Sequence, residues 1–306
     1  MQMNPIRIGT RGSPLALAQA HETRDRLVAA HGLDPANIEV VVISTTGDQI
    51  QDRPLAEIGG KGLFTRELEE QLHDGRIDMA VHSMKDMPAV LPEGLEICCL
   101  LEREDPRDAF LSPVATSISA LAHGAIVGSS SVRRVAQLRH IRPDLDIVPF
   151  RGNVQTRLRK LSEGVAAATF LACAGLNRLG MSELMTCPID PAEMLPAVAQ
   201  GAIGIEIASM NDHARALLEP LNHQPTWLRV TAERAFLAEL DGSCRTPLAG
   251  HATLDDGGLH LKVQALTLDG SKVFETARRG PAADGAAMGL DAAHEIRAKA
   301  GQDLVS

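Results

Sequence analysis

Aromatic residues are scarce in this sequence. Its 306 residues contain six Phe, one Trp and no Tyr, together 2% of the chain. Proteins that bind single-stranded nucleic acid stack the bases on aromatic side chains, and too few are present here to form such a surface. The formal net charge of −9 also argues against a general binder of nucleic acid or of anionic membranes. We therefore expect no nucleic acid and no membrane as a partner.

Long apolar runs are also missing. No uncharged apolar stretch is long enough to cross a bilayer, and residues 1–9 show neither the apolar core nor the cleavage pattern of a signal peptide. We expect a cytoplasmic protein. With 44% hydrophobic and 23% charged residues, the composition is that of an ordinary globular protein, and the length suits two or three domains.

The cysteines are few and unpaired. The five of them, at positions 98, 99, 173, 187 and 244, form neither a disulfide framework nor a paired CxxC zinc pattern. We expect free thiols, as in a reducing compartment. Cys98, Cys99 and Cys173 lie in apolar segments that predict strands. Cys244 instead lies in a polar loop beside a positive charge that favours the thiolate, so it is either a nucleophile or a spectator thiol.

One predicted strand ends in a cluster of reactive side chains. Residues 77–81 form a mostly apolar run that predicts a buried strand. The groups that follow are His82, Ser83, Lys85 and Asp86. Open α/β sheets place ligand chemistry at the carboxyl ends of their strands. A hydrolase triad and a zinc site are disfavoured, because no nucleophile elbow surrounds Ser83 and no three zinc ligands are suitably spaced. Asp86 is interpreted as a general acid/base, with a helix cap as the alternative, and we expect no metal.

Basic residues recur where a predicted strand passes into a helix. Such junctions follow the strands expected at 6–9, 125–128, 145–150 and 168–174. Their basic residues are Arg11, Arg133, Arg134, Arg151, Arg157 and Arg178. Helix N-termini bind anions, and Arg suits bidentate recognition of carboxylates. The pattern predicts a ligand with several carboxylates or phosphates. The alternatives are solvated basic helix faces or an RNA-binding patch, and the acidity and missing aromatics lower the RNA alternative.

The remaining segments predict further domains. The charge run 102–108 is interpreted as a solvated crossover into a second domain, and 195–202 as a hinge that returns to the first. An amphipathic helix is expected over 226–240. Alternating apolar residues over 259–265, with turn signals on both sides, predict a three-stranded antiparallel sheet, followed by a helix near 286–300.

Several long motifs, in order along nearly the whole chain, resemble the porphobilinogen deaminase (hydroxymethylbilane synthase) family. They are Thr10–Leu17, Gly59–Phe64, Ala80–Asp86, Glu102–Phe110, Gly128–Arg134, Arg151–Val154, Val230–Ala235 and the loop around Cys244. The resemblance implies an α/β fold: two periplasmic-binding-protein-like lobes with mixed, mainly parallel sheets, plus a small α+β C-terminal domain with a three-stranded antiparallel sheet. Domain 1 is then expected at 1–101 and 202–222, domain 2 at 102–201 and domain 3 at 223–306.

The resemblance also implies an activity. It is that of a transferase in tetrapyrrole, porphyrin and haem biosynthesis that joins four porphobilinogen molecules head to tail, with release of ammonia from each. The chain would grow on a dipyrromethane cofactor, bound by a thioether to Cys244, and hydrolysis would release hydroxymethylbilane. Each pyrrole carries an acetate and a propionate. A monomer with a small-molecule substrate is expected. The competing interpretation is a two-lobed dicarboxylate-binding module without catalysis, which leaves the third domain and Cys244 unexplained.

Roles for single residues follow from the same resemblance. Asp86 matches the family's catalytic acid, and His82 is expected to be structural. The residues expected to hold the cofactor are Cys244, Lys85, Ser131, Arg133, Arg134 and Asp86. Those expected to bind the substrate are Arg11, Ser13, Phe64, Ser83, Arg151, Arg157, Arg178 and Gln200. The positions that depart from the family pattern are Glu57, Ala167, Ala199 and Ser243. Ala199 stands where Gly is common and is expected to stiffen the hinge.

Overall fold

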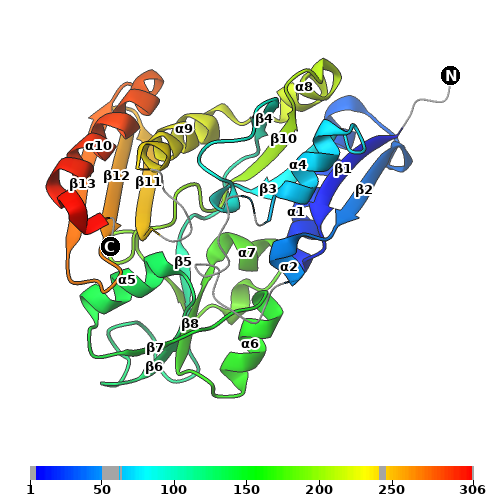
Figure 1. The fold of residues 1–306 in the computed structure, drawn as a ribbon. Helices are drawn as coiled ribbons and strands as arrows, with labels where there is room; N and C mark the ends of the chain where they lie inside the picture. Colours follow the sequence, from blue (N-terminus) through cyan, green and yellow to red (C-terminus); the bar gives the residue numbers. More distant parts are fainter. Residues whose placement is uncertain (1–4, 50–61, 63, 241–245, 305–306) are drawn as a thin grey trace. The chain divides into compact units, whose positions relative to one another are not determined.

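A computed structural model describes residues 5–49, 62, 64–240 and 246–304 (Figure 1). They form two compact units, each of which is described by itself. The described residues of the first unit lie within 1–51, 60–104 and 202–227, and those of the second lie mainly within 105–201 and 228–306. The expected division into three domains stays a prediction.

A five-stranded sheet, in the order β2-β1-β3-β10-β4, forms the centre of the first unit. Its strands are β1 (Ile6–Arg11), β2 (Ile38–Ile43), β3 (Met79–Ser83), β4 (Leu95–Leu100) and β10 (Ile203–Ala208). β1 runs parallel to β2 and β3, whereas β10 is antiparallel to β3 and β4. The other elements are α1 (Pro14–His31), η1 (Pro35–Asn37), α2 (Thr46–Gln49), α4 (Arg66–His73), η2 (Met84–Asp86), α8 (Asp212–Leu218) and η4 (Glu219–Leu221).

Both faces of this sheet are covered by helices. Met79 and Val81 of β3 pack in a core that includes Leu27 of α1. Ala80, between them, packs on the opposite face in a core that includes Leu68 of α4. Successive side chains of a strand point to opposite faces. A strand that is buried on both faces therefore has to be apolar throughout, which is why 79–81 contains no polar residue.

The second unit contains a sheet of the same kind, in the order β7-β6-β8-β5-β9. Its strands are β5 (Asp108–Leu111), β6 (Ile126–Gly128), β7 (Asp146–Val148), β8 (Ala168–Ala172) and β9 (Cys187–Pro188). β6 is parallel to β7 and β8, and β5 is antiparallel to β8 and β9. Its helices are α5 (Val132–Ile141), α6 (Val154–Ser162), α7 (Cys173–Arg178) and the turn η3 (Ser182–Leu184). Leu138 of α5 packs in one core of this unit, and Leu161 of α6 with Leu176 of α7 in another.

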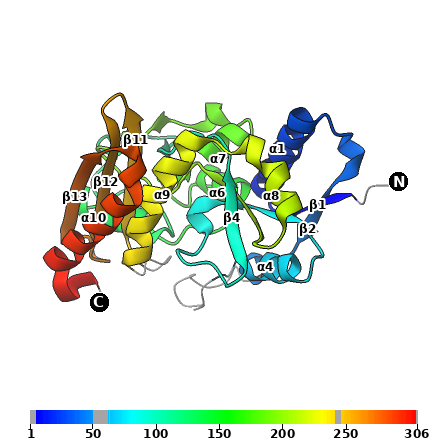
Figure 2. The same cartoon turned by 90° about the horizontal axis from the view of Figure 1, so that it is seen from above.

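The C-terminal part of the second unit is a three-stranded antiparallel sheet with helices beside it (Figure 2). Its elements are α9 (Gln224–Glu239), β11 (Leu248–Asp255), β12 (Gly258–Leu266), β13 (Val273–Gly280), η5 (Ala282–Asp284), α10 (Gly285–Ala300) and η6 (Gly301–Leu304). α10 packs closely on α9, because a Cβ on Gly289 would overlap the carbonyl oxygen of Ala232. Together with the two mixed sheets, this sheet confirms the predicted fold class.

Two local predictions are wrong. The charge run 102–108 is not simply solvated, because Arg103 is 9% exposed and Asp108, the first residue of β5, is 0% exposed. The strand predicted over 168–174 ends at Ala172, and Cys173 begins α7. Cys173 is nevertheless buried, and burial raises the pKa of its thiol to about 12. Burial raises the pKa of the Cys98 thiol to the same range, so neither thiol ionises at neutral pH.

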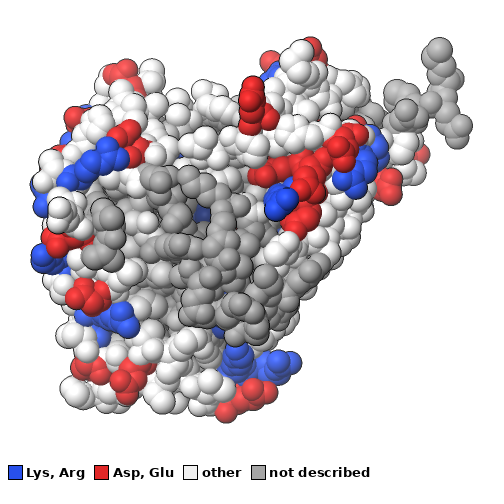
Figure 3. All heavy atoms as spheres, in the orientation of Figure 1, with Lys and Arg blue, Asp and Glu red and all other residues white. Residues whose placement is uncertain are grey.

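Charges of both signs are mixed on the face shown in Figure 3. On the described part of that face, Lys and Arg side chains alternate with Asp and Glu, and acidic side chains gather where Figure 1 draws α4. This part of the surface lacks the wide basic area that nucleic acid requires. Within the described ranges, no helix is both long and apolar enough to cross a membrane.

Ala199 has an unusual backbone conformation. It is the only residue other than glycine in the described part of the chain with a positive φ, 58°. This left-handed conformation brings Cβ close to a carbonyl oxygen and costs about 1–2 kcal/mol. The Ala199 N–H donates a hydrogen bond of 2.6 Å to Oε2 of Glu233, a carboxylate that is 0% exposed. The strained conformation is therefore held by a buried acceptor, just before the chain passes from the second unit to the first at Ala202.

We predict that Ala199→Gly raises the free energy of unfolding by about 1 kcal/mol, because glycine adopts a positive φ without the Cβ clash. Urea unfolding monitored by circular dichroism would measure the change. The matched control is Ala202→Gly, where the φ is not positive and the substitution should lower stability by about 0.5–1 kcal/mol. A loss of stability in Ala199→Gly as large as that of the control would contradict the prediction.

Candidate active site

The carboxyl end of β3 opens into a pocket of the first unit. The residues around it are Arg11, Ser13, Leu15, Ala16, Gln19, Phe64, Thr65, Val81, His82, Ser83 and Asp86. Asp86 is exposed at this pocket and belongs to the turn η2, together with the half-buried Lys85. The turn is held by a hydrogen bond of 3.0 Å, which the Met84 N–H donates to the Ala202 carbonyl oxygen. The strand thus ends in a rigid turn that presents Asp86 to the pocket.

The N-terminus of α1 forms another wall of the same pocket. The Ser13 hydroxyl accepts a hydrogen bond of 3.2 Å from the Ala16 N–H, and Pro14 occupies the first turn, so Ser13 caps this helix. The Arg11 guanidinium lies 4.1 Å from the centre of the Phe64 ring, a cation–π contact. Arg11 and Phe64, which are far apart in the sequence, therefore meet beside the helix N-terminus, where an anionic group and a flat ring could both bind.

Gln19 is a residue of this pocket that the sequence analysis missed. Its side chain is bonded to the Ser83 hydroxyl, with Nε2 to Oγ at 2.8 Å and Oγ to Oε1 at 3.1 Å. Gln19 is 4% exposed, although it lies in the middle of α1. A buried amide among the apolar positions of a helix is a detectable sign, because such a group needs a partner. The partner here is Ser83, one of the residues predicted to bind the substrate.

His82 is buried and pairs with a carboxylate. Its Nε2 lies 3.0 Å from Oε2 of Glu206, and the two side chains are 4% and 0% exposed. Glu206 lies on β10, 124 residues away in the sequence, and the sequence analysis did not identify it. A third buried group, Glu69 of α4, is 8% exposed. Burial raises the pKa of Glu69, and the nearby Glu206 carboxylate adds to the effect.

His82, Glu206 and Glu69 together determine the net charge of this buried region. Two buried carboxylates with one imidazole would carry a net negative charge, which is costly in a region of low dielectric constant. Burial and the nearby Glu206 carboxylate both raise the pKa of Glu69, so the neutral form of Glu69 is favoured in this region.

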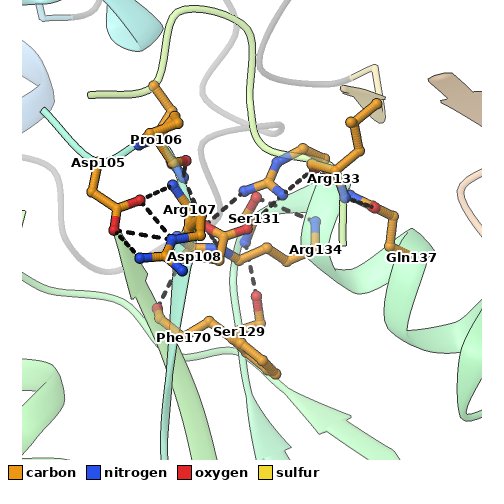
Figure 4. A network of polar contacts seen from close by, with 12 residues as sticks. Asp105, Pro106, Arg107, Asp108, Ser129, Ser131, Arg133, Arg134, Gln137 and Phe170 are labelled. Carbon is orange, nitrogen blue, oxygen red and sulfur yellow. Dashed lines mark hydrogen bonds and ion pairs between the residues drawn. The ribbon is translucent and has the colours of Figure 1, made fainter. Parts of the chain in front are cut away.

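In the second unit, the sequence-predicted residues converge on Asp108 (Figure 4). Arg133 Nη1 lies 2.7 Å from Asp108 Oδ2, and Arg134 Nη2 lies 2.6 Å from Oδ1. Gln200 Nε2 donates to Oδ1 at 2.9 Å. Burial opposes ionisation of Asp108, but the two guanidinium groups outweigh it and hold the pKa of Asp108 well below its usual range. Ser131, also predicted, caps α5 by accepting the Arg134 N–H at 3.4 Å.

The other predicted arginines of this unit have separate contacts. Arg157 Nε donates to the Gly152 carbonyl oxygen at 2.9 Å, and Arg178 Nη2 donates to that of Gly201 at 3.1 Å. Nη1 of Arg151 is buried, and no described residue accepts a hydrogen bond from it. Arg151 thus lies in the loop before α6 and Arg157 in the helix itself, and Arg178 contacts the residue next to Gln200.

The predicted residues therefore form two sets, one in each unit. The set of the first unit is Arg11, Ser13, Phe64, Ser83, Lys85 and Asp86. The set of the second unit is Ser131, Arg133, Arg134, Arg151, Arg157, Arg178 and Gln200. Cys244, expected to carry the cofactor, lies outside the described residues, as do Glu57 and Ser243. In the part of the chain that the structure describes, no three His, Cys, Asp or Glu side chains are grouped to hold a metal ion.

Comparison with known proteins identifies the family. Residues 6–216 match the family model described as "Porphobilinogen deaminase, dipyromethane cofactor binding domain", and residues 227–298 match "Porphobilinogen deaminase, C-terminal domain". The chain belongs to the porphobilinogen deaminase family. A relative named porphobilinogen deaminase from Paracoccus denitrificans (strain Pd 1222) is 62% identical, over 98% of this chain and 96% of the relative. A chloroplastic porphobilinogen deaminase from Oryza sativa subsp. japonica is 56% identical, over 97% of this chain and 84% of the relative.

Comparison with solved structures also gives a match. It is a periplasmic substrate-binding protein of an ABC transporter from Coxiella burnetii, 14% identical, with a TM-score of 0.43 over 75% of this chain and 96% of that chain. The interpretation of the chain as a binding module without catalysis is not supported, since the deaminase models match both the lobes and the C-terminal part.

The second unit offers donors that fit the family's dipyrromethane cofactor. Arg133 Nε and Arg151 Nη1 are buried, and neither has an acceptor among the described residues. Buried N–H groups without acceptors are costly, so such groups favour a ligand that supplies oxygens. The acetate and propionate groups of a dipyrromethane are oxygen acceptors of the planar kind that Arg binds in bidentate fashion. The residues of this porphobilinogen deaminase family member thus suit the group.

The raised pKa of Glu69 predicts a specific dependence of stability on pH. In the unfolded chain the carboxyl ionises near its ordinary pKa of 4.5, whereas in the folded protein it retains its proton to higher pH. Folded-state stability therefore falls as the pH rises above that value. Glu69→Gln cannot ionise, so its stability relative to wild type should increase from about pH 4 to about pH 7. Urea unfolding across this range would measure the difference.

Glu70→Gln is the matched control for this experiment. Glu70 neighbours Glu69 on α4, but its side chain is 56% exposed and pairs with Arg66 at the surface. Its substitution should not produce a stability difference that increases with pH. A constant difference between Glu69→Gln and wild type over the whole range would mean that Glu69 ionises normally and that the buried cluster has a different charge balance.

Proposed function

We propose that this protein is a hydroxymethylbilane synthase, a transferase that joins four porphobilinogen molecules head to tail, with release of ammonia, in tetrapyrrole biosynthesis. The observation that carries the proposal is the 62% identity to a porphobilinogen deaminase over 98% of the chain. The proposal includes a monomeric protein in the cytoplasm. Its substrate, a pyrrole with an acetate, a propionate and an aminomethyl group, has the chemical groups that the two sets of side chains are suited to bind.

The pocket of the first unit is proposed to receive the incoming substrate. Arg11 and the free N–H groups of α1 would bind a substrate carboxylate. Phe64 offers an aromatic face for the pyrrole ring. Ser13 and Ser83 supply hydroxyls at the rim, and the hydrogen bond with Gln19 fixes the Ser83 side chain. These contacts would hold the aminomethyl group of the substrate near Asp86.

Asp86 is proposed to be the catalytic residue. It protonates the departing amine or holds its proton, so that ammonia leaves as a neutral molecule. The remaining carbon is a cation that is delocalised onto the pyrrole nitrogen, and the Asp86 carboxylate stabilises this charge. A carboxylate about 4 Å from such a cation contributes about 4 kcal/mol at an effective dielectric constant of about 20. That energy corresponds to roughly a thousandfold in rate.

Cys244 is proposed to hold the cofactor covalently. The non-covalent set is Lys85, Asp86, Ser131, Arg133 and Arg134. When bound, the dipyrromethane supplies the free pyrrole carbon to which the first substrate is joined. Cys244 would form the thioether, because Arg245 beside it favours the reactive thiolate. In the second unit, Arg151, Arg157 and Arg178 would bind the carboxylates of the lengthening product, and Gln200 would contribute its amide.

Asp86→Asn should abolish most of the activity while leaving the fold intact. Asn has nearly the same shape but neither the charge nor the acid, so we expect turnover of porphobilinogen to fall about a thousandfold. Product formation would be measured in steady state, and circular dichroism would check the fold. Asp74→Asn is the control, since Asp74 is a surface partner of Arg76 in the same unit. Turnover of Asp86→Asn near that of the control would remove Asp86 from the mechanism.

Cys244→Ser should prevent attachment of the cofactor. Intact-protein mass spectrometry of wild type supplied with porphobilinogen should show an added mass equal to that of a dipyrromethane, and Cys244→Ser should lack it. Cys187→Ser is the matched control, because Cys187 is a half-exposed thiol of the second unit, and it should keep the adduct. An unmodified wild type after supply of porphobilinogen would favour a binding module over the proposed enzyme.

A further inference from the structure

Asp108 is a buried charge to which the proposed reaction gives no role. It is the first residue of β5 and is 0% exposed. In the sequence it ends a dense charge run, 102–108, of the kind that usually lies in solvent. A carboxylate is almost never fully buried unless it is paired. The contacts of Asp108 therefore need an explanation beyond the stability of the strand.

Asp108 holds two guanidinium groups at once (Figure 4). Arg133 donates to it through Nη1 at 2.7 Å and Nη2 at 3.2 Å. Arg134 donates through Nε at 3.1 Å and Nη2 at 2.6 Å. Each guanidinium is thus bound through two nitrogens, the arrangement that fixes both its position and the orientation of its plane.

Backbone carbonyls hold the other side of each guanidinium. Arg133 Nη1 also donates to the Leu195 carbonyl oxygen at 2.9 Å, and Arg134 Nη1 to that of Phe170 at 2.8 Å. The two residues are each 5% exposed. An arginine side chain loses rotamer entropy when it is fixed. Here contacts within the protein already fix both arginine side chains before any ligand binds, so binding does not have to order them.

The cluster is one negative charge short of neutrality. It combines the two positive charges of Arg133 and Arg134 with the single negative charge of Asp108. Burial lowers the pKa of Arg133, which reflects the cost of removing its charge from water. Arg133 Nε is buried as well, and no acceptor for it exists among the described residues. One further carboxylate would supply both the missing charge and the missing acceptor.

We propose that Asp108 is a positioning residue, which holds Arg133 and Arg134 in the geometry that receives one carboxylate of the dipyrromethane cofactor. The inference rests on the proposed function. It assigns Asp108 an effect on cofactor attachment that acts through the two arginines and not through contact with the ligand. Gln200 donates to Asp108 Oδ1 at 2.9 Å and to the Pro106 carbonyl oxygen at 2.8 Å, so it adds a further hydrogen bond to the carboxylate.

Two substitutions test whether Asp108 acts through the position of its carboxylate or through its charge alone. Asp108→Asn keeps the shape but removes the charge and one acceptor oxygen, so the two guanidiniums lose their fixed partner. Asp108→Glu keeps the charge but displaces the carboxylate by one methylene. If Asp108 acts by position, both variants should attach the cofactor more slowly than wild type. If it acts only by its charge, Asp108→Glu should match wild type, and Asp108→Asn, which is more positive, should capture the anion faster.

The experiment follows attachment directly. Protein produced without a supply of porphobilinogen is mixed with porphobilinogen, and intact-protein mass spectrometry measures the rate at which the dipyrromethane adduct appears. For both Asp108 variants we expect this rate to fall about tenfold, the effect of losing about 1.4 kcal/mol of preorganisation. Thermal unfolding of the same samples shows whether the variants are folded.

Thr169→Val is the matched control. Thr169 is a buried polar residue of β8 in the same unit, and its hydroxyl donates to the Gly128 carbonyl oxygen at 2.8 Å and not to Asp108. Its loss should lower stability and leave the attachment rate within about twofold of wild type. Attachment by folded Asp108→Glu at the wild-type rate would overturn the inference, as would faster attachment by Asp108→Asn. A wild type that forms no adduct would instead contradict the proposed function.

Discussion

Burial of the central strands of both five-stranded sheets is the constraint on which the rest of the structure depends. Helices pack on both faces of these strands, so a polar group within them is costly unless it has a partner. The polar side chains of the site lie either at a strand end or beside a buried partner. Asp86 uses the first solution, in the turn after β3. His82 and Asp108 use the second, since each is bonded to a buried side chain.

The two units solve the problem of buried charge in opposite ways. In the first, the acidic groups Glu69 and Glu206 outnumber the single imidazole of His82, and burial raises the pKa of Glu69 and so favours its neutral form. In the second, Arg133 and Arg134 outnumber Asp108, and an arginine does not give up its proton at neutral pH. The excess positive charge must therefore be met by a ligand or by solvent, which makes this cluster suited to bind an anion.

Local pattern was sufficient to predict several strands and the C-terminal antiparallel sheet, because apolar runs that end in polar residues and alternating apolar residues are visible in the sequence. The two-lobed fold followed from the resemblance to the family, and the roles of the site residues stay predictions. Partners far apart in the chain were not predictable in this way. The contact of His82 with Glu206 spans 124 residues, and that of Gln19 with Ser83 spans 64. Periodicity marks such residues as buried but carries no information on which partner satisfies them.

The charge run 102–108 shows why composition can mislead. A dense mixture of acids and bases usually lies in solvent, because each isolated charge is costly to bury. Asp108 escapes this rule since Arg133, Arg134 and Gln200 all reach it from elements later in the chain. Gln200 in turn follows Ala199, whose strained backbone is fixed by the buried Glu233 carboxylate. The burial of Asp108 therefore depends on partners that only the folded chain brings together, which composition does not reveal.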